Sequence, residues 1–468
     1  MPKLNVNSRF RASGPLRPLL FAWVGCCLIC ATTPAWAEPE KGADANPTTA
    51  GTKDPKNKKK PPPGKPLGSD SVESPAKGTT PEMKLVNAIP VEDFKKDRAA
   101  FSNLIISGKL SGDEDRKLLE RGIKYHLARM TQPELRFKLY DINAQILRDL
   151  YYSHLASSFQ VHDAYLEILV KLIDEMKLLQ NNYYVRQNVA ALLARLTFRE
   201  KNEDVQLYEP AYRMLMAIMR DRKQIPAVKI HAVRGLTLYF HDASISPQTR
   251  NSIVQSFLNE LTNENSQEPA YLLRIIESLG VLGQVEAEEG RRPIVVQKLM
   301  QIVVNDERDM LLRTASARAI GRLPLETPQG GLNIELIAIE FVKLGRTMAD
   351  DWELAEQQDS WAWRYCFWNL YCAFHWEDDK EKQKGWGLLA QVEQKTRLAS
   401  YKNITKEAFT MIVPLVNKVV LGSDKVDLPK HVEEMAKWTQ AHTPRSDRIA
   451  PSEEPILTDA APKKETPK

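Results

Sequence analysis

The chain repeats itself at an almost constant interval, and this constrains its fold more than any other feature. Five segments align on one position near the start of a predicted helix, at Arg186, Lys229, Leu272, Arg313 and Arg364. The intervals are 43, 43, 41 and 51 residues, and a further copy at Arg136 would lie 50 residues before Arg186. A unit of this size cannot bury its apolar face alone, so neighbouring units must stack against one another.

Each unit contains two stretches in which apolar residues recur with helical spacing, such as Leu166, Leu169 and Ile173. We expect the first helices at about 161–180, 205–222, 247–262, 293–304 and 334–348. We expect the second helices to begin near 133, 183, 226, 269, 309 and 359. No convincing alternation of apolar and polar residues and no Asn-Gly or Asp-Gly turn is found, so the sequence predicts an all-α fold.

The start of each second helix carries its own signal. Four residues before the aligned position stand Gln132, Asn182, Ile225, Glu268, Asp309 and Ser360. Asn, Asp and Ser favour N-caps because their side chains accept the unpaired backbone N–H groups. Pro133, Pro226 and Pro269 follow directly, and the first helical turn tolerates proline. This register places Ala190, Ala232 and Ala317 at close helix contacts, and Leu193, Leu236 and Ile320 in the stacked core.

The run Asp309, Leu312-Arg313, Ala317 and Ala319-Ile320-Gly321 resembles the consensus of the HEAT-repeat family of armadillo-like α-solenoids. The resemblance covers roughly residues 110–421, although the 50- and 51-residue intervals depart from the family's usual length. It implies a right-handed α-α superhelix of about five to six helix pairs, whose second helices line a concave surface. In this family the aligned basic residue bonds to the preceding turn; the alternative is a ladder of Arg186, Lys229, Arg313 and Arg364 that contacts an acidic ligand.

The first 37 residues have the pattern of a signal peptide. Four basic residues precede an apolar run over 19–31, and Ala35-Trp36-Ala37 supplies small residues for cleavage before Glu38. The apolar run is short for a membrane helix, which needs about 20 residues. The alternatives are an uncleaved anchor and a lipoprotein modified at Cys26. We therefore expect an exported, periplasmic or secreted protein of bacterial type, with no transmembrane span after the signal is removed.

Two polar segments flank the body of the chain. Residues 38–85 are rich in proline and lysine, including 58–66, and we expect a disordered tether because they contain few large apolar residues to bury. Its lysines either contact the cell envelope or form a solvated spacer. Residues 443–468 are also polar and proline-rich, which predicts a disordered tail. The helical solenoid is then expected over 86–442.

Charge and cysteine content restrict the function further. Lys and Arg total 65 and Asp and Glu total 60, which gives a net charge of +5. Removing the signal and its four basic residues lowers this charge to about +1, which argues against a strongly basic nucleic-acid binder. Of the five cysteines, Cys366 and Cys372 remain outside the signal. Six residues apart on one helix, they are too distant for a disulfide and should be buried free thiols.

We find no motif typical of catalysis or of a cofactor. The sequence lacks zinc-spaced Cys and His residues and the Gly-rich nucleotide and nucleophile motifs, so we expect neither metal nor cofactor. His375 precedes an acidic run, which is read as a solvated turn or, alternatively, as a metal site. The main alternative function is a toroidal all-α enzyme acting on polysaccharide as a lyase or hydrolase. Its acid and base candidates would be Asp350, Asp351, Glu353, Glu377 and Asp379.

Tryptophan is concentrated in residues 352–386, which contain six of the seven tryptophans outside the signal. On a helix, Trp361, Tyr365 and Trp368 share one face, whereas Trp363, Phe367, Leu370 and Phe374 share another. The segment forms either a bulky core or an exposed strip that anchors a protein partner or stacks on sugar rings. The residues predicted to bind a partner are Trp361, Trp363, Arg364, Tyr365 and Trp368. We expect a non-catalytic scaffold that binds protein or another macromolecule in its concave groove.

Overall fold

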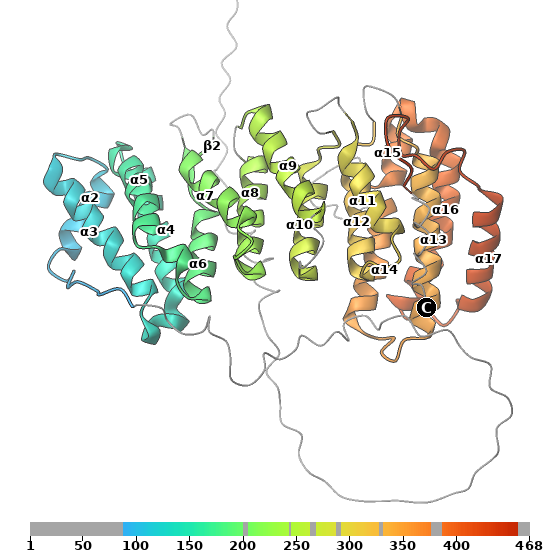
Figure 1. Ribbon diagram of the computed structural model, residues 1–468, viewed down its shortest axis with the longest axis horizontal. Coiled ribbons are helices and arrows are strands. Elements are labelled where there is room, and N and C mark those ends of the chain that lie inside the picture. The colour runs from blue at the N-terminus through green and yellow to red at the C-terminus, as the bar shows by residue number, and fades with distance from the viewer. Residues whose placement is uncertain are drawn as a thin grey trace, which may run out of the picture. The chain divides into compact units, whose positions relative to one another are not determined.

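The helices follow one another along the chain as neighbouring pairs, and Figure 1 colours them from blue at the N-terminal end to red at the C-terminal end. The computed structural model describes residues 88–199, 205–242, 245–262, 268–286, 292–326, 331–375 and 386–456. The predicted signal peptide and tether, residues 1–37 and 38–85, lie outside these residues. Apart from one short hairpin and one isolated β-bridge, the secondary structure of the described residues is helical. The expected all-α class is therefore confirmed for this part of the chain.

The described chain begins with α2 (Arg98–Ser107) and α3 (Asp113–Met130). The first helices of the pairs are α5 (Gln160–Glu175), α7 (Glu209–Arg220), α9 (Pro247–Thr262), α11 (Ile294–Val304) and α13 (Ile334–Glu353). The second helices are α4 (Leu139–Leu155), α6 (Tyr183–Leu193), α8 (Pro226–Asp242), α10 (Pro269–Leu282), α12 (Met310–Arg322) and α14 (Trp361–Phe374). The chain continues through α15 (Leu388–Gln394), α16 (Lys402–Val419) and α17 (Leu428–Ala441). Short 3-10 turns are η2 (Pro133–Lys138), η3 (Leu178–Gln180) and η5 (Thr396–Tyr401).

The second helices pack against one another in chain order. α4 contacts α6, α6 contacts α8, and the same relation continues through α10, α12 and α14 to α16. Each of α7, α9, α11 and α13 also packs against the second helix that follows it. In the described residues, each second helix thus packs against the second helices before and after it.

Small residues allow the second helices to approach closely. Ala190, Ala232 and Ala317 are fully buried, as the register predicted. At Gly280 an added Cβ would lie 2.9 Å from the Cα of Ala319, so a larger residue would push α10 away from α12. The predicted core residues Leu193, Leu236 and Ile320 each have 0% exposure. The burial predicted for these six residues is therefore confirmed.

The predicted caps are confirmed at three of the helix starts. The side chains of Asn182, Asp309 and Ser360 accept backbone hydrogen bonds at the starts of α6, α12 and α14. Pro226 and Pro269 are the first residues of α8 and α10. Because a cap satisfies donors within one turn, a short sequence signal is enough to fix these helix starts.

A small hairpin corrects the expectation that the chain has no strands. β1 (Thr197–Arg199) pairs antiparallel with β2 (Val205–Leu207) directly after α6. As a result α7 begins at Glu209, and not at 205 as expected. Strands of three residues are too short to show an alternating pattern, so periodicity did not predict them. The first helix of the preceding unit was expected over 161–180 and is shorter. Helix α5 ends at Glu175, and the chain then forms the 3-10 turn η3.

The C-terminal segment 443–456, which we call the strap, corrects the prediction of a disordered tail. Ile449 and Ile456 are buried in the core, and the backbone N–H of Asn333 donates to the carbonyl of Ile449 at 2.8 Å. The Arg292 guanidinium forms two hydrogen bonds with Glu453, whose side chain is 1% exposed. The partners of the strap are supplied by residues more than a hundred positions earlier, so composition alone did not reveal its order. Residues 457–468 lie outside the described part.

Two further expectations concern single features of the body. Cys366 and Cys372 are buried free thiols, as predicted, and burial raises the pKa of Cys366 to about 12.

In the described residues no helix is both long enough and apolar enough to cross a membrane. All described residues fall within one unit of the chain, residues 62–468.

Candidate binding surface

Helix α14 separates its aromatic residues onto two sides. Trp363 is 4% exposed, and Phe367, Leu370 and Phe374 are fully buried where α14 packs against α12, α13 and α16. Trp363 was predicted to bind a partner, but its burial makes it a core residue. The face of α14 that contains Trp363 and Phe367 is thus part of the core.

The other side of α14 faces solvent at its N-terminal end. Trp361 is 70% exposed, and its ring stacks on that of Tyr365 with centroids 4.9 Å apart and an angle of 15°. Trp368 is only half-buried and stacks instead on Tyr371, at 5.4 Å. The side chain of Arg364 is exposed, and its guanidinium lies 3.6 Å from a carboxylate oxygen of Asp359. Of the predicted binding residues, the structure therefore brings Trp361 and Tyr365 together at the surface.

Neighbouring second helices extend this surface with charged groups. The Tyr365 hydroxyl donates to Glu277 of α10 at 3.1 Å, and Glu277 forms an ion pair with Arg274 at 2.9 Å. Burial, and then the Glu277 carboxylate, raises the pKa of Tyr365 to about 12. A tyrosine hydroxyl, a carboxylate and a guanidinium from two helices thus meet in one network.

Helix α12 adds two arginines to the same surface. Arg318 donates to the side-chain oxygen of Asn369 at 3.2 Å, and the Arg322 guanidinium lies 4.8 Å from the ring centroid of Trp386. Burial, and then the neighbouring charge of Arg318, lowers the pKa of Arg322 to about 10. Two cations are therefore held close together and partly removed from water.

The row of arginines continues onto α8 and the turn after α6. Burial, and then the charges of Arg234, Arg195 and Arg274, lower the pKa of His231 to about 4. Arg234 lies on α8 and Arg274 on α10, which pack against each other, and Arg195 follows α6, which packs against α8. We call the set the arginine face; it comprises Arg195, Arg234, Arg274, Arg318 and Arg322, with Glu277 among them. Sequence reasoning missed this set, because its members are spread over more than 120 residues.

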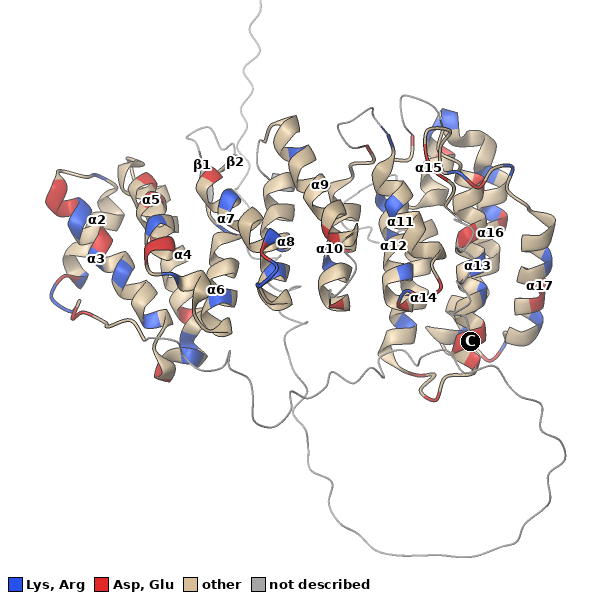
Figure 2. Cartoon of the chain, viewed as in Figure 1, with Lys and Arg blue, Asp and Glu red and all other residues tan. Residues whose placement is uncertain are grey.

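The two sets of helices differ in charge. By sequence, second helices α6, α8, α10, α12 and α14 carry eight Lys or Arg and two Asp or Glu, a net +6. First helices α5, α7, α9, α11 and α13 carry seven Lys or Arg and eleven Asp or Glu, a net −4. Basic segments recur along α6, α8 and α12 in Figure 2. The nearly neutral whole chain therefore contains a basic layer of helices.

The aligned basic ladder is structural at three of its four positions. Arg186 donates to Gln224 at 2.9 Å, Lys229 lies 3.4 Å from Glu260, and Arg313 donates to the carbonyl of Val303 at 2.9 Å. All three side chains are buried. These contacts join each buried basic side chain to a neighbouring turn or helix. Arg364 differs, since it is exposed.

The residues considered for catalysis do not assemble into a described site. Asp350 lies 3.9 Å from Arg346, and burial raises the pKa of Asp351, whereas Arg313 lowers it. Glu377 and Asp379 lie outside the described residues, as do the carboxylates next to His375. Within the described ranges no group of three His, Cys, Asp or Glu residues is placed to hold a metal.

A second exposed aromatic surface lies on η2 and α4. Its large exposed residues are Phe137, Tyr140, Tyr151, Tyr152 and Leu155, with exposed fractions from 48% to 83%. Arg136 lies over the Phe137 ring at 4.4 Å. Tyr140, Tyr151 and Leu155 recur at helical spacing opposite the buried Ile142 and Ile146, so periodicity could have identified this face.

Comparison with known proteins adds no relative: no protein-family model, no curated protein and no solved structure matches this chain. The functional argument therefore depends on the repeat pattern, the packing of the helix pairs and the chemistry of the exposed surface.

Proposed function

We propose that this chain is a non-catalytic, exported scaffold that binds a protein, or another macromolecule, through the exposed side of its second helices. In this proposal the stacked pairs form a HEAT-like, armadillo-like right-handed solenoid, and the exposed side of the second helices is its concave surface. The observation that carries the proposal is the stacked pair of Trp361 and Tyr365, with Trp361 70% exposed, at one end of the arginine face.

The physical reason is that a large exposed aromatic ring contributes to binding far more than to folding. A tryptophan buried on association removes a large apolar area from water, and Trp, Tyr and Arg dominate the residues whose truncation weakens interfaces most. The stack of Trp361 on Tyr365 also holds the indole in one orientation, so less side-chain entropy is lost when a partner covers it. Tyr365 is itself fixed by its hydrogen bond to Glu277.

Export is part of the same proposal. The basic residues, apolar run and Ala35-Trp36-Ala37 site predict that the mature chain begins near Glu38 and acts in the periplasm or outside the cell. The lysine-rich tether would then connect the body to the cell envelope or act as a spacer. Sequencing the N-terminus of the mature protein tests this part, and an intact Met1 in a cytosolic fraction would contradict it.

The polysaccharide-acting toroid enzyme has no specific observation in its favour. It needs helix pairs that close a ring around two convergent carboxylates. In the described residues the packing runs from pair to pair, and no extensive contact joins α16 or α17 to α2, α3, α4 or α5. We therefore propose only the scaffold function.

The test compares two exposed side chains of similar exposure. Tagged protein is recovered with its partners from envelope and culture extracts, and the partners are identified by mass spectrometry. We expect Trp361→Ala to lose the specific partner, and the control Leu421→Ala, where Leu421 is 72% exposed, to retain it. Both variants should melt like the wild type. An unchanged set of partners in Trp361→Ala would overturn the proposed surface.

A further inference from the structure

We infer that the arginine face and the stack of Trp361 on Tyr365 form one site for an extended, acidic segment of a partner protein. This inference rests on the proposed scaffold function and adds the chemistry of the partner. It predicts a segment with repeated Asp or Glu residues and one apolar side chain at the end that meets Trp361.

The first argument is charge. Its five members, Arg195, Arg234, Arg274, Arg318 and Arg322, lie on α8, α10 and α12 and directly after α6, and these helices pack in this order. The one carboxylate placed between them is Glu277, which bonds to Arg274 and Tyr365. The mutual repulsion of nearby guanidinium groups is relieved when carboxylates from a partner come between them. The depressed pKa of Arg322 is a sign of this repulsion and of partial removal from water. A partner with negative charge is therefore favoured over a neutral or basic one.

The second argument is the kind of cation. All five members are arginine, whose planar fork forms two parallel hydrogen bonds with a carboxylate. The pairing of Arg274 with Glu277, at 2.9 Å, is an example of a carboxylate within the site itself. Tyr365 adds a hydroxyl that already donates to a carboxylate oxygen. The surface thus contains the groups that recognise Asp and Glu side chains.

The third argument is spacing. The arginines lie on successive second-helix segments, and packed helices are about 8–10 Å apart. An extended chain advances about 3.3 Å per residue, so it would meet a new helix roughly every three residues. From the end of α6 to α14 there are four such steps, which corresponds to a segment of about 10–12 residues. A partner chain with an acidic residue at about every third position matches this row.

The apolar anchor favours a protein over other polyanions. Trp361 is exposed at the α14 end, where a leucine or an aromatic side chain of a peptide could cover it. Side chains of both kinds, acidic and apolar, occur side by side in a peptide. An anionic polysaccharide and single-stranded nucleic acid supply the charge as well, so both serve as competing probes in the test.

The experiment measures binding of four labelled probes to the full mature chain by fluorescence anisotropy. The first is a 12-residue peptide with Glu at every third position and a terminal Leu. The second contains the same residues with the glutamates clustered at one end. The others are polygalacturonate and a 12-nucleotide single strand. We expect the spaced peptide to bind most tightly, at least threefold more tightly than the clustered one. Tighter binding of the polysaccharide or the nucleic acid would overturn the inference.

Matched variants assign the binding to the arginine face. Arg195 and Arg234 are exposed, so the double variant Arg195→Gln, Arg234→Gln should fold like the wild type. It should weaken the spaced peptide at least tenfold. The control Arg213→Gln removes an exposed arginine from first helix α7 and should change the affinity less than twofold. Equal effects of the double variant and the control would contradict the site.

The imidazole of His231 provides a second readout at the site. Its pKa is lowered to about 4 by burial and then by Arg234, Arg195 and Arg274. Carboxylates bound among these arginines should raise that pKa, which NMR titration of the histidine signals can follow with and without peptide. A pKa of His231 unchanged at saturating peptide would show that the peptide binds elsewhere and would overturn the inference.

The outcomes also separate this inference from the function on which it rests. If no acidic peptide binds but Trp361→Ala still loses a partner from extracts, the acidic segment is wrong and the scaffold stands. If Trp361→Ala loses no partner and no peptide binds, both fail. If the spaced peptide binds, and Trp361→Ala both weakens that binding and loses the partner from extracts, both are supported.

Discussion

The two sides of the second helices use the same kinds of residue for different purposes. On the buried side, Trp363 and Arg313 are 4% and 5% exposed. On the other side, Trp361 is 70% exposed and the side chain of Arg364 is 51% exposed. The residues of each pair are of one type, and in the tryptophan pair they are two positions apart on one helix. The comparison teaches that position on the helix, rather than residue type, separates the stacking groups from those available to a partner.

The largest expected effect is the difference between the two tryptophans. Trp363→Ala should lower the free energy of unfolding by about 3–5 kcal/mol, the usual loss for truncating a buried large aromatic. Trp361→Ala should change it by less than about 0.5 kcal/mol, as for other exposed substitutions. Chemical denaturation of the two variants gives both values. Similar losses for the two would break the comparison.

The aliphatic residues of the stack should show losses of the same order. Leu193→Ala and Ile320→Ala should each lower the free energy of unfolding by about 2–5 kcal/mol, because both side chains are completely buried between stacked helices. Urea unfolding measures the change. Losses under about 1 kcal/mol at both positions would mean that the repeat register is wrong.

Substitutions of the aligned basic residues should change the free energy of unfolding by an intermediate amount and so sharpen the comparison. Arg313→Met should lower the free energy of unfolding by about 1–3 kcal/mol, because the carbonyl of Val303 then loses its buried donor. Arg364→Met should change it by less than about 0.5 kcal/mol, because an exposed ion pair contributes little. If Arg364→Met is as harmful as Arg313→Met, the ladder is structural at all four positions.

The smallest expected effect is the contribution of one histidine to the pH dependence of stability. Burial is the main cause that lowers the pKa values of His126, His162 and His231 to about 4, from an ordinary 6.5. Their stabilising contribution is complete above pH 6.5 and is lost as the pH falls towards 4, because the unfolded chain then binds protons that the folded chain does not. Stability should therefore fall between pH 6.5 and 4.

Asp149 acts in the opposite direction in the same range. Burial raises its pKa to about 6, so its contribution is complete below pH 3.8 and is lost as the pH rises through 6. Three histidines outweigh one carboxyl, and the net slope should be positive with pH. Removing one of them with His231→Gln should reduce that slope by up to about 1.4 kcal/mol per pH unit, the limit for one bound proton. Thermal unfolding measured from pH 7 to pH 5 tests this, and an unchanged slope would refute it.

The sequence predicted most of the fold because its main signals are local. Second helices were expected at 183, 226, 269, 309 and 359, and α6, α8, α10, α12 and α14 begin within two residues of these positions. A cap such as Asn182 or Ser360 acts within one helical turn, so a short segment contains the whole signal. Burial of Leu193 and Ile320 followed from periodicity and the repeat interval in the same way.

The features that the sequence did not predict depend on distant partners. The order of Ile449 and Glu453 arises from Asn333 and Arg292, which no local pattern connects with them. The arginine face is assembled from one or two residues per helix, so neither the net charge nor any short motif contains it. For α14 the periodicity separated its two faces, but both are aromatic, and only packing shows that Trp363 is the buried one.

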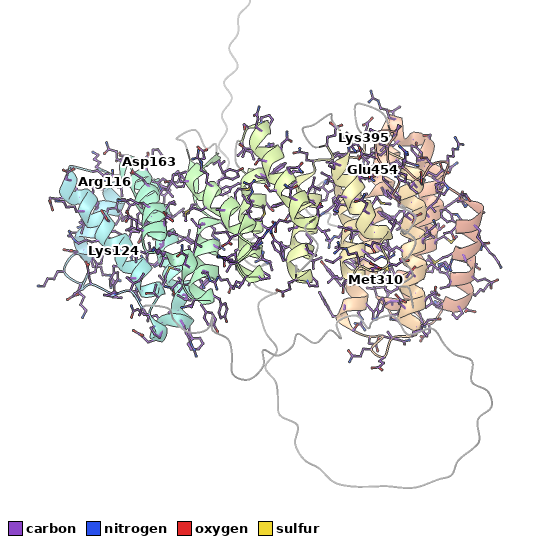
Figure 3. All side chains as sticks on the ribbon, viewed as in Figure 1. Arg116, Lys124, Asp163, Met310, Lys395 and Glu454 are labelled. Atoms are coloured by element: carbon purple, nitrogen blue, oxygen red, sulfur yellow. The ribbon has the colours of Figure 1, made fainter. Side chains whose placement is uncertain are left out.

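The strap has a consequence for the order in which the chain folds. Neighbouring pairs make contacts roughly 40–50 residues apart, whereas Arg292 and Gln297 reach strap residues 161 and 157 positions later, near Glu454 in Figure 3. Contacts between distant residues form late, because a long loop must close first. A chain that emerges N-terminus first would assemble its early pairs while α11 and α13 still wait for their last contacts. The strap would then hold α11 and α13 in place, so folding of these helices finishes only after residues 443–456 have emerged.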